Sequence, residues 1–147
     1  LVACCDIAIG TPAARFGLTE TRLGLLPAVI SPYVVAAIGP RQARRWFASA
    51  GTFDADTAAR IGLLHEVVAA EALDAAVQAQ VELLCRAAPR ATGMAKALVR
   101  QVLAERDPAA CDRANAGLIA ALRVSPEGQE GLGAFLEKRT PAWATEA

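Results

Sequence analysis

The feature that most limits how this chain can fold is a row of short amphipathic helix patterns in its second half. They cover 71–87, 89–104, 108–121 and 125–137, and each opens with a proline, a serine or an acidic residue. Isolated helices shorter than about 12–15 residues are marginally stable in water, so each of these needs a surface to pack against. Few strand patterns in this half could supply one. We therefore expect self-association through residues 88–137.

The first half of the chain combines strand and helix patterns, which predicts the α/β class. Residues 1–9 are apolar except for Asp6, and a Gly-Thr-Pro turn signal follows them. This pattern is typical of a strand that is buried on both faces. We expect a second short strand at 14–16, and we expect Cys4 and Cys5 to fill the core.

Turn and cap residues divide the middle of the chain into short elements. Ser31 precedes a proline and predicts the N-cap of a helix, and Gly39 predicts the end of that helix. The next proline restarts a helix at 41–49, with apolar residues on one side. The other side carries Arg41, Arg44 and Arg45. We interpret this basic side as a solvated helix surface. Asp54 predicts a cap for another helix, and the β-type run 63–68 follows it.

Composition and charge exclude several classes of function. The 147 residues are 54% hydrophobic and 20% charged, which predicts a globular protein rather than a disordered segment. Fifteen basic and fifteen acidic residues cancel, so nothing indicates a general binder of nucleic acid or of anionic membranes. The four cysteines have no CxxC spacing and His65 is the only histidine, so we predict no metal site and a structural role for His65.

The ends of the sequence suggest an expectation about its extent. The chain has no initiator methionine and opens directly on the apolar run, so we expect an incomplete fold whose N-terminal part is absent. It shows no signal-peptide pattern and no uncharged apolar run of about 18 residues. We therefore predict a soluble, cytoplasmic protein.

One carboxylate stands in an unusually apolar run, "FGLTETRLGLLPAV". This residue, Glu20, has two possible roles. It could form a solvated surface pair with Arg22, worth about 0–1 kcal/mol. It could instead lie against Leu18, Leu23 and Leu25, where desolvation would let it exchange a proton near neutral pH. Spacing alone does not decide between the two.

Three segments closely resemble the enoyl-CoA hydratase/isomerase (crotonase) superfamily. They are "ACCDIAIGTPAARFGLTETRLGLLPAVISPY", "FDADTAARIGLLHEVV" and "SPEGQEGLGAFLEKRTPAW". In that family a Cys-Asp strand is followed by Phe-Gly, a glutamate, a glycine and a proline in a fixed order. The matching residues here are Cys5, Asp6, Phe16, Gly17, Glu20, Gly24 and Pro27. The ordered set is specific, although each piece alone would be weak.

The resemblance implies a fold, a reaction and a role for Glu20. The fold would be the C-terminal part of the crotonase ββα spiral over 1–87, followed by a helical oligomerisation region over 88–147. The reaction would be hydration of an enoyl-CoA thioester, without metal or other cofactor, in a homotrimer or homohexamer. Glu20 matches the glutamate that protonates the α-carbon. The second carboxylate and the oxyanion-hole donors of the family precede the matched segment, so we expect the chain alone to be inactive.

The resemblance also suggests the substrate and its contacts. "PAVISPY" and the closing motif are similar to the branch that hydrates methylglutaconyl-CoA or isohexenylglutaconyl-CoA, carboxylated thioesters of leucine and terpene breakdown. Pro27, Ser31 and Tyr33 would then contact the substrate, with Ser31 and Tyr33 near its extra carboxylate because a helix N-terminus attracts anions. Phe135 and Lys138 match positions that line the CoA site. Helix packing and a solvated helix end are their alternative roles.

Two other functions stay open. A Δ3,Δ2-enoyl-CoA isomerase keeps the oxyanion hole and works with one carboxylate, so the residue at the family's second carboxylate position would distinguish it from a hydratase. A non-catalytic fragment would retain only the helices that contact other subunits.

Overall fold

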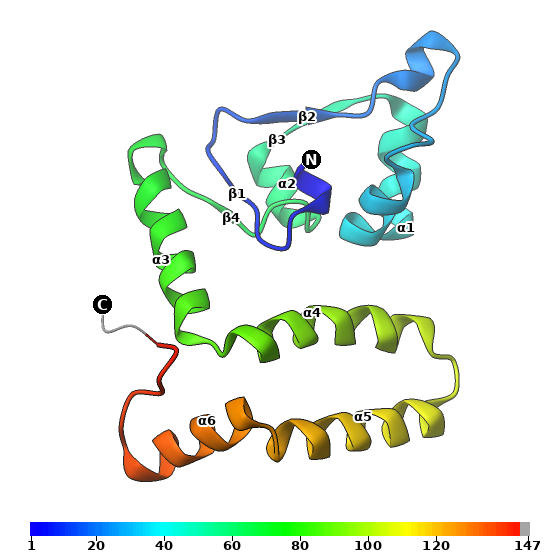
Figure 1. Cartoon of the computed structure of the whole chain (residues 1–147). Helices are drawn as coiled ribbons and strands as arrows, with labels where there is room; N and C mark the ends of the chain where they lie inside the picture. Colours follow the sequence, from blue (N-terminus) through cyan, green and yellow to red (C-terminus); the bar gives the residue numbers. More distant parts are fainter. Residues whose placement is uncertain (145–147) are drawn as a thin grey trace. The chain divides into compact units, whose positions relative to one another are not determined.

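The computed structural model describes residues 1–144, which form two compact units (Figure 1). The first unit is Leu1–Gln78 and the second begins at Ala79, so their boundary falls inside helix α3 (Leu73–Arg86). The boundary predicted from the sequence, between 87 and 88, lies further along, just after the end of the same helix.

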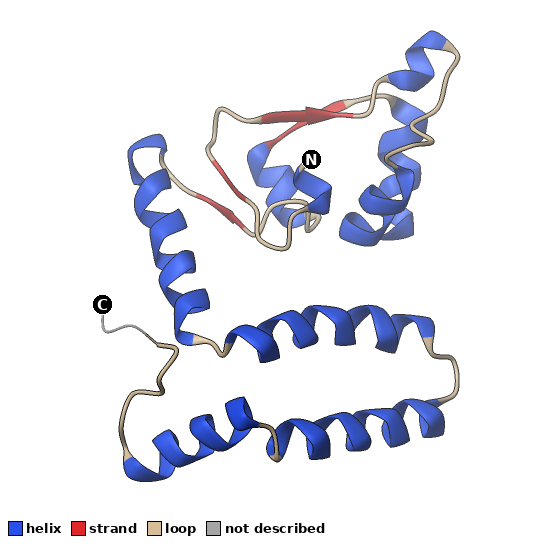
Figure 2. Cartoon of the chain, viewed as in Figure 1, coloured by secondary structure: helices blue, strands red, loops and turns tan. Residues whose placement is uncertain are grey.

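The first unit is built on two small sheets (Figure 2). Strand β1 (Ile9–Gly10) pairs in parallel with β4 (Glu66–Val67), so Ile9 lies opposite Glu66. Strand β2 (Arg15–Gly17) pairs antiparallel with β3 (Thr52–Asp54). The connection between the parallel strands contains two α-helices, and a parallel pair needs such a long crossover. The α/β class and the second strand are therefore confirmed, the strand being shifted by one residue.

The longer helix of the first unit contains the predicted break. Helix α1 (Ser31–Ser49) bends at Gly39, whose φ of 73° and ψ of 162° are not helical, and Pro40 starts the second half. Helix α2 (Ala55–Arg60) begins after Asp54, whose carboxylate accepts the backbone N–H of Thr57 at 2.8 Å. The Gly39 stop and the Asp54 cap are confirmed.

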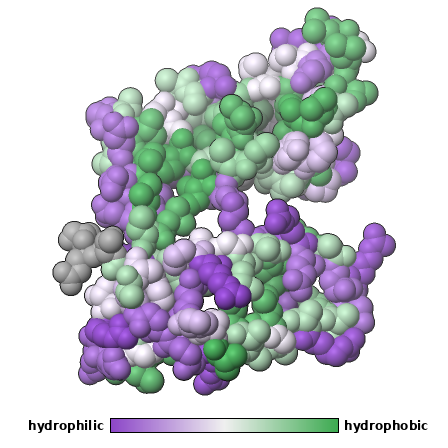
Figure 3. Space-filling model, in the orientation of Figure 1, coloured by the Kyte–Doolittle hydropathy of each residue, from purple (hydrophilic) through white to green (hydrophobic). Residues whose placement is uncertain are grey.

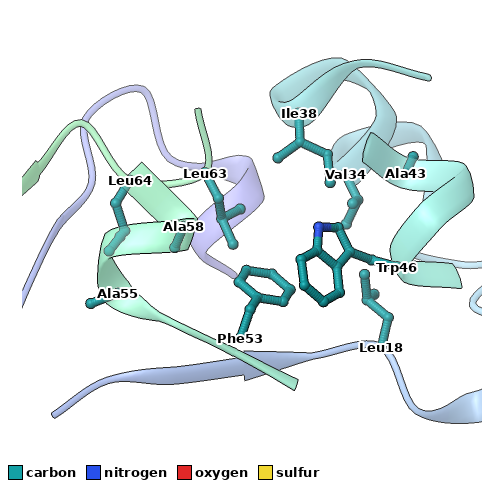
Figure 4. Packing of buried hydrophobic residues seen from close by; sticks show 10 residues of the cluster. All are labelled: Leu18, Val34, Ile38, Ala43, Trp46, Phe53, Ala55, Ala58, Leu63 and Leu64. Atoms are coloured by element: carbon teal, nitrogen blue, oxygen red, sulfur yellow. The ribbon is translucent and has the colours of Figure 1, made fainter. Parts of the chain in front are cut away.

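The core of the first unit is small, and hydrophobic residues also reach its surface (Figure 3). The indole of Trp46 packs on Phe53 with ring centroids 4.4 Å apart (Figure 4). Phe53 also stacks on Phe16, with ring centroids 5.7 Å apart. The cluster consists of Leu18, Val34, Ile38, Ala43, Trp46, Phe53, Ala55, Ala58, Leu63 and Leu64. It therefore joins both halves of α1 to the β2–β3 sheet and to α2.

The prediction of a strand over residues 1–9 is wrong for most of that segment. Residues Val2–Cys4 form the 3-10 helix η1, and only Ile9 and Gly10 are in a strand. A strand persists only where a neighbour completes its backbone hydrogen bonds, and β4 does so over two residues. Cys4 and Cys5 are consequently exposed instead of filling the core.

Two other local predictions also need correction. Ser31 is the first residue of α1 and Ile30 is its N-cap, without a side-chain hydrogen bond. The Ser31 hydroxyl instead donates to the carbonyl of Ala28 at 2.9 Å. The run 63–68 is a strand only at β4, because Leu63 and Leu64 turn into the core. His65 has the predicted structural role: its Nδ1 accepts the N–H of Ala8 at 3.1 Å.

The second unit is helical, and its helices begin where proline and cap residues predicted. The short η3 (Ala70–Ala72), still in the first unit, leads into α3. The helices α4 (Pro89–Ala104), α5 (Pro108–Arg123) and α6 (Pro126–Glu137) follow in the second unit. Asp107 caps α5 and Ser125 caps α6 through backbone N–H groups. The Glu127 carboxylate accepts the N–H groups of Arg90 and Ala91, which ties the start of α6 to the start of α4.

The chain after α6 folds back onto that helix. The guanidinium of Arg139 binds both carboxylate oxygens of Glu130 at 2.7 and 2.9 Å, and the N–H of Ala142 donates to the same carboxylate at 2.7 Å. Trp143 closes the turn over Gly131, where a Cβ atom would lie 2.9 Å from the indole. Across residues 1–144, no helix has the length and apolarity needed to cross a membrane.

Candidate active site

Glu20 opens a short, well-fixed turn. It is the first residue of the 3-10 helix η2 (Glu20–Leu23), which ends at Gly24 in the left-handed conformation with φ of 72°. The carbonyl of Glu20 accepts the N–H of Leu25 at 3.2 Å, so the backbone on both sides of the turn is held. The side chain is half-buried, and its Oε2 atom is fully buried without a hydrogen-bond partner among residues 1–144.

A buried carboxylate oxygen without a partner is uncommon. Burying such a group without a hydrogen bond costs about 1–3 kcal/mol, so native structures retain few of them. A bound water or ion, local strain or a chemical role can each account for such a group, and Gln42, Trp46 and Asn115 also have one buried side-chain atom without a partner among residues 1–144. Glu20 therefore qualifies as a candidate acid or base.

The surroundings of Glu20 differ from both sequence expectations. Leu18 is 7% exposed, but Leu23 and Leu25 are 77% and 63% exposed, so only Leu18 belongs to a buried apolar environment. Arg22 is exposed, and within residues 1–144 it forms no ion pair with Glu20. The surface pair with Arg22 is therefore absent from the structure, while the apolar enclosure is only partly present.

A pocket of about 480 Å³ begins at the residue after Glu20. It lies between η2, the loop that follows it and the second half of α1. Its lining residues are Thr21, Leu26, Pro27, Ser31, Arg44, Phe47 and Ala48. The Thr21 hydroxyl donates to the carbonyl of Phe47 at 3.0 Å and fixes η2 against α1. The structure thus brings Pro27 and Ser31 together, whereas Tyr33 is 52% exposed and does not line this pocket.

Arg41, Arg44 and Arg45 are all exposed, as the sequence predicts for a solvated helix surface. Arg45 lies over the ring of Trp46 at 4.5 Å. The sequence does not predict that Arg44 also lines this pocket. Arg44 differs because Phe47 and Ala48, three and four positions further on, share its side of the helix. The spacing of three and four residues between Arg44 and these two residues is the sequence signal that could have identified Arg44 as a pocket residue.

Two further predicted site residues lie in the second unit. Phe135 is 79% exposed, so helix packing does not account for its side chain in this chain. Lys138 is the C-cap of α6 and has φ of 55°, the left-handed conformation that glycine usually occupies. Neither residue lines the pocket of about 520 Å³ between the ends of α4, α5 and α6.

No group of three His, Cys, Asp or Glu side chains within 1–144 is arranged to hold a metal ion.

Comparison with known families gives this geometry a context. The family model for enoyl-CoA hydratase/isomerase matches residues 1–146. The chain belongs to the enoyl-CoA hydratase/isomerase family. Its crotonase-type α/β fold is thereby established, and the superfamily resemblance found in the sequence is confirmed.

Solved structures of the family superpose closely on the chain. A Legionella pneumophila protein described as an enoyl CoA hydratase/isomerase (crotonase) is 45% identical with a TM-score of 0.91, over 97% of this chain and 55% of that one. Pseudomonas aeruginosa AtuE is 42% identical with a TM-score of 0.92, over 99% of this chain and 56% of that one.

A curated relative shows the same extent of match. The 2,3-dehydroadipyl-CoA hydratase of Escherichia coli is 32% identical over 145 residues, which are 96% of this chain and 55% of that protein. The chain thus spans about half the length of the relatives it matches.

Proposed function

We propose that the protein is an enoyl-CoA hydratase that adds water across the 2,3-double bond of an enoyl-CoA thioester, with Glu20 as the acid that protonates the α-carbon. The observation that carries the proposal is the buried, unpartnered Oε2 of Glu20 in a chain of the enoyl-CoA hydratase/isomerase family. Hydration needs a proton donor at the α-carbon after water has attacked C3. A carboxyl group held in place by η2, with one oxygen free of protein partners, suits that step.

The remaining roles in the reaction are proposed for groups outside the described residues. The thioester oxygen gains negative charge as the enolate forms, and backbone N–H donors would stabilise it. A second carboxylate would orient the attacking water. The family resemblance puts these groups before the segment that this chain matches, so we expect residues 1–147 alone to show no measurable hydration.

We further propose that the acyl group carries a distal carboxylate, as in the glutaconyl thioesters of leucine or terpene breakdown. The "PAVISPY" segment supports this class. So does the similarity to a hydratase whose name, 2,3-dehydroadipyl-CoA hydratase, describes a carboxylated enoyl thioester. Pro27, Ser31 and Tyr33 would lie along the acyl group, with Pro27 and Ser31 in the wall of one pocket.

The second unit would contribute to CoA binding and to assembly. Phe135 would contact CoA with its exposed ring, and Lys138 would face the nucleotide phosphates. The exposed Leu103 and Leu136, 81% and 78% accessible, support a proposed homotrimer or homohexamer that uses the helical region 88–147, with 1–87 as part of the ββα spiral. A cytoplasmic location is proposed with this function.

The reaction class is tested with the protein at its full natural length. Hydration of crotonyl-CoA and of 3-methylglutaconyl-CoA is followed by the loss of enoyl-thioester absorbance, and the conversion of a 3-enoyl-CoA to the 2-enoyl isomer is followed in parallel. The proposal expects hydration of at least one 2-enoyl substrate. Isomerisation without hydration would replace it with the isomerase alternative, and no turnover of any thioester would contradict it.

A further inference from the structure

We propose that the guanidinium of Arg44 binds the distal carboxylate of the acyl group inside the 480 Å³ pocket beside η2. The inference rests on the proposed function and names the residue that selects its substrate class. Such a role differs from that of Glu20, because Arg44 would act on the end of the acyl group away from the reacting double bond.

The pocket has the composition that a carboxylated acyl chain needs. Leu26, Pro27, Phe47 and Ala48 form apolar walls that suit methylene and methyl groups. Arg44 is the only lining residue with a formal charge. A carboxylate that enters a mostly apolar pocket loses water, so it requires a cation and hydrogen-bond donors there.

The hydroxyl groups of the pocket are already used as donors inside the protein. Thr21 donates to the Phe47 carbonyl at 3.0 Å, and Ser31 donates to the Ala28 carbonyl at 2.9 Å. Their oxygens can still accept hydrogen bonds, but a carboxylate offers none. Among the side chains that line the pocket, Arg44 thus supplies the free N–H groups.

Within residues 1–144, Arg44 has no carboxylate partner. The structure gives it no ion pair with any residue of 1–144, whereas Arg139 is bound by Glu130 and Glu137. A guanidinium presents N–H groups in a planar fork that matches both oxygens of a carboxylate. An unpaired fork at an apolar pocket is therefore complementary in charge and in shape to the end of a dicarboxylic acyl chain.

The N-terminus of α1 is a weaker candidate for the same carboxylate. The N–H of Ser31 donates to Pro27 and that of Val34 donates to Ile30, both at 3.0 Å. Pro32 has no N–H. The N–H groups of Ser31 and Val34 are therefore not available to an anion, which leaves that of Tyr33 among the first residues of α1. Because this single donor is uncharged and a guanidinium offers a charged fork, we expect Arg44 to make the main contact with the carboxylate.

Arg44 lines the same pocket as Thr21, the neighbour of Glu20 in the sequence. The pocket begins at Thr21, the residue directly after the proposed acid Glu20, and reaches α1 at Phe47, which Thr21 contacts. A substrate that presents its α-carbon to Glu20 would extend its far end along this wall toward α1. Arg44 is on that helix, one turn before Phe47.

The test compares substrates that differ only in the distal carboxylate. The protein at its full natural length is assayed with crotonyl-CoA and with glutaconyl-CoA. The variant is Arg44→Met and the control is Arg41→Met. Arg41 is an exposed residue of the same helix, and it does not line this pocket. We expect Arg44→Met to lower kcat/KM for glutaconyl-CoA by about 10- to 100-fold and to leave crotonyl-CoA within about twofold. Arg41→Met should change neither.

Binding of saturated thioesters separates this inference from the reaction itself. Glutaryl-CoA and butyryl-CoA cannot be hydrated, so their dissociation constants, measured by calorimetry, report recognition alone. Preference for glutaryl-CoA in the parent and its loss in Arg44→Met would support the inference even if no hydration occurred. Equal affinity for the two thioesters in the parent, an equal loss for both in Arg44→Met, or no binding of either would overturn it.

Discussion

Gly128 is the position where the structure predicts the largest effect of adding a single methyl group. It lies in the first turn of α6, against the end of α5. A Cβ atom there would overlap the carbonyl oxygen of Leu122 and lie 3.1 Å from its carbonyl carbon and 3.3 Å from the oxygen of Arg123. These are backbone atoms, so the clash is relieved only if the α5–α6 junction opens.

The size of the Gly128→Ala effect follows from two opposing contributions. Alanine in place of glycine within a helix stabilises it by about 1 kcal/mol. Overpacking against atoms that cannot rotate away costs about 3 kcal/mol, the upper end of the usual range. We therefore expect a net loss of about 2 kcal/mol, which lowers Tm by about 4–8 °C for a chain of this size.

Two other helical glycines provide matched controls. A Cβ atom at Gly117 in α5 or at Gly93 in α4 would meet nothing within 4 Å. Gly117→Ala and Gly93→Ala should each raise stability by about 0.5–1 kcal/mol. All three variants are compared by circular dichroism during thermal unfolding. A Gly128→Ala protein as stable as Gly117→Ala would refute the close contact at the α5–α6 junction.

Two further predictions concern the end of α6. The guanidinium of Arg139 and the N–H of Ala142 hold the pKa of the Glu130 carboxyl at about 2. The ionised Glu130 therefore stabilises the fold fully above a pH of about 4.5, and this stabilisation is lost as the pH falls toward 2. The Tm difference between the parent and Glu130→Gln should accordingly vanish over that range, and an equal difference at pH 7 and pH 2.5 would contradict the assignment. Lys138→Gly should raise stability by about 1 kcal/mol, because glycine suits φ of 55°, and it should weaken CoA binding about three- to fivefold. CoA affinity unchanged in calorimetry would remove Lys138 from the proposed CoA site.

Local signals were sufficient for the helices because the groups that start and end a helix are close in sequence. Asp54, Asp107 and Ser125 each accept a backbone N–H two or three residues ahead, so the sequence that contains the cap also contains its donor. The Gly39–Pro40 break is local for the same reason. Most helix boundaries were therefore predictable within about two residues.

Strands and sites were harder to predict because their partners are distant in sequence. Whether residues 1–9 form a strand depends on Glu66 and Val67, which complete only two residues of it. The role proposed for Arg44 depends on a pocket that it shares with Thr21 and Pro27, which are about 20 residues away in the sequence. Glu20 was identified through an ordered family motif, and its unpartnered oxygen became visible only in three dimensions.

The central claim is that Glu20 protonates the α-carbon of an enoyl thioester, and kcat of a Glu20→Gln variant tests it most directly. The substitution keeps the size of the side chain and removes the transferable proton. In the protein at its full natural length we expect kcat for hydration to fall by about 10²- to 10⁴-fold with KM nearly unchanged. The matched control is Glu71→Gln, which alters an exposed glutamate in the 3-10 helix η3 and should leave kcat unchanged. A Glu20→Gln protein that retains kcat within about threefold of the parent would contradict the catalytic assignment, since a residue that transfers the proton contributes far more than that.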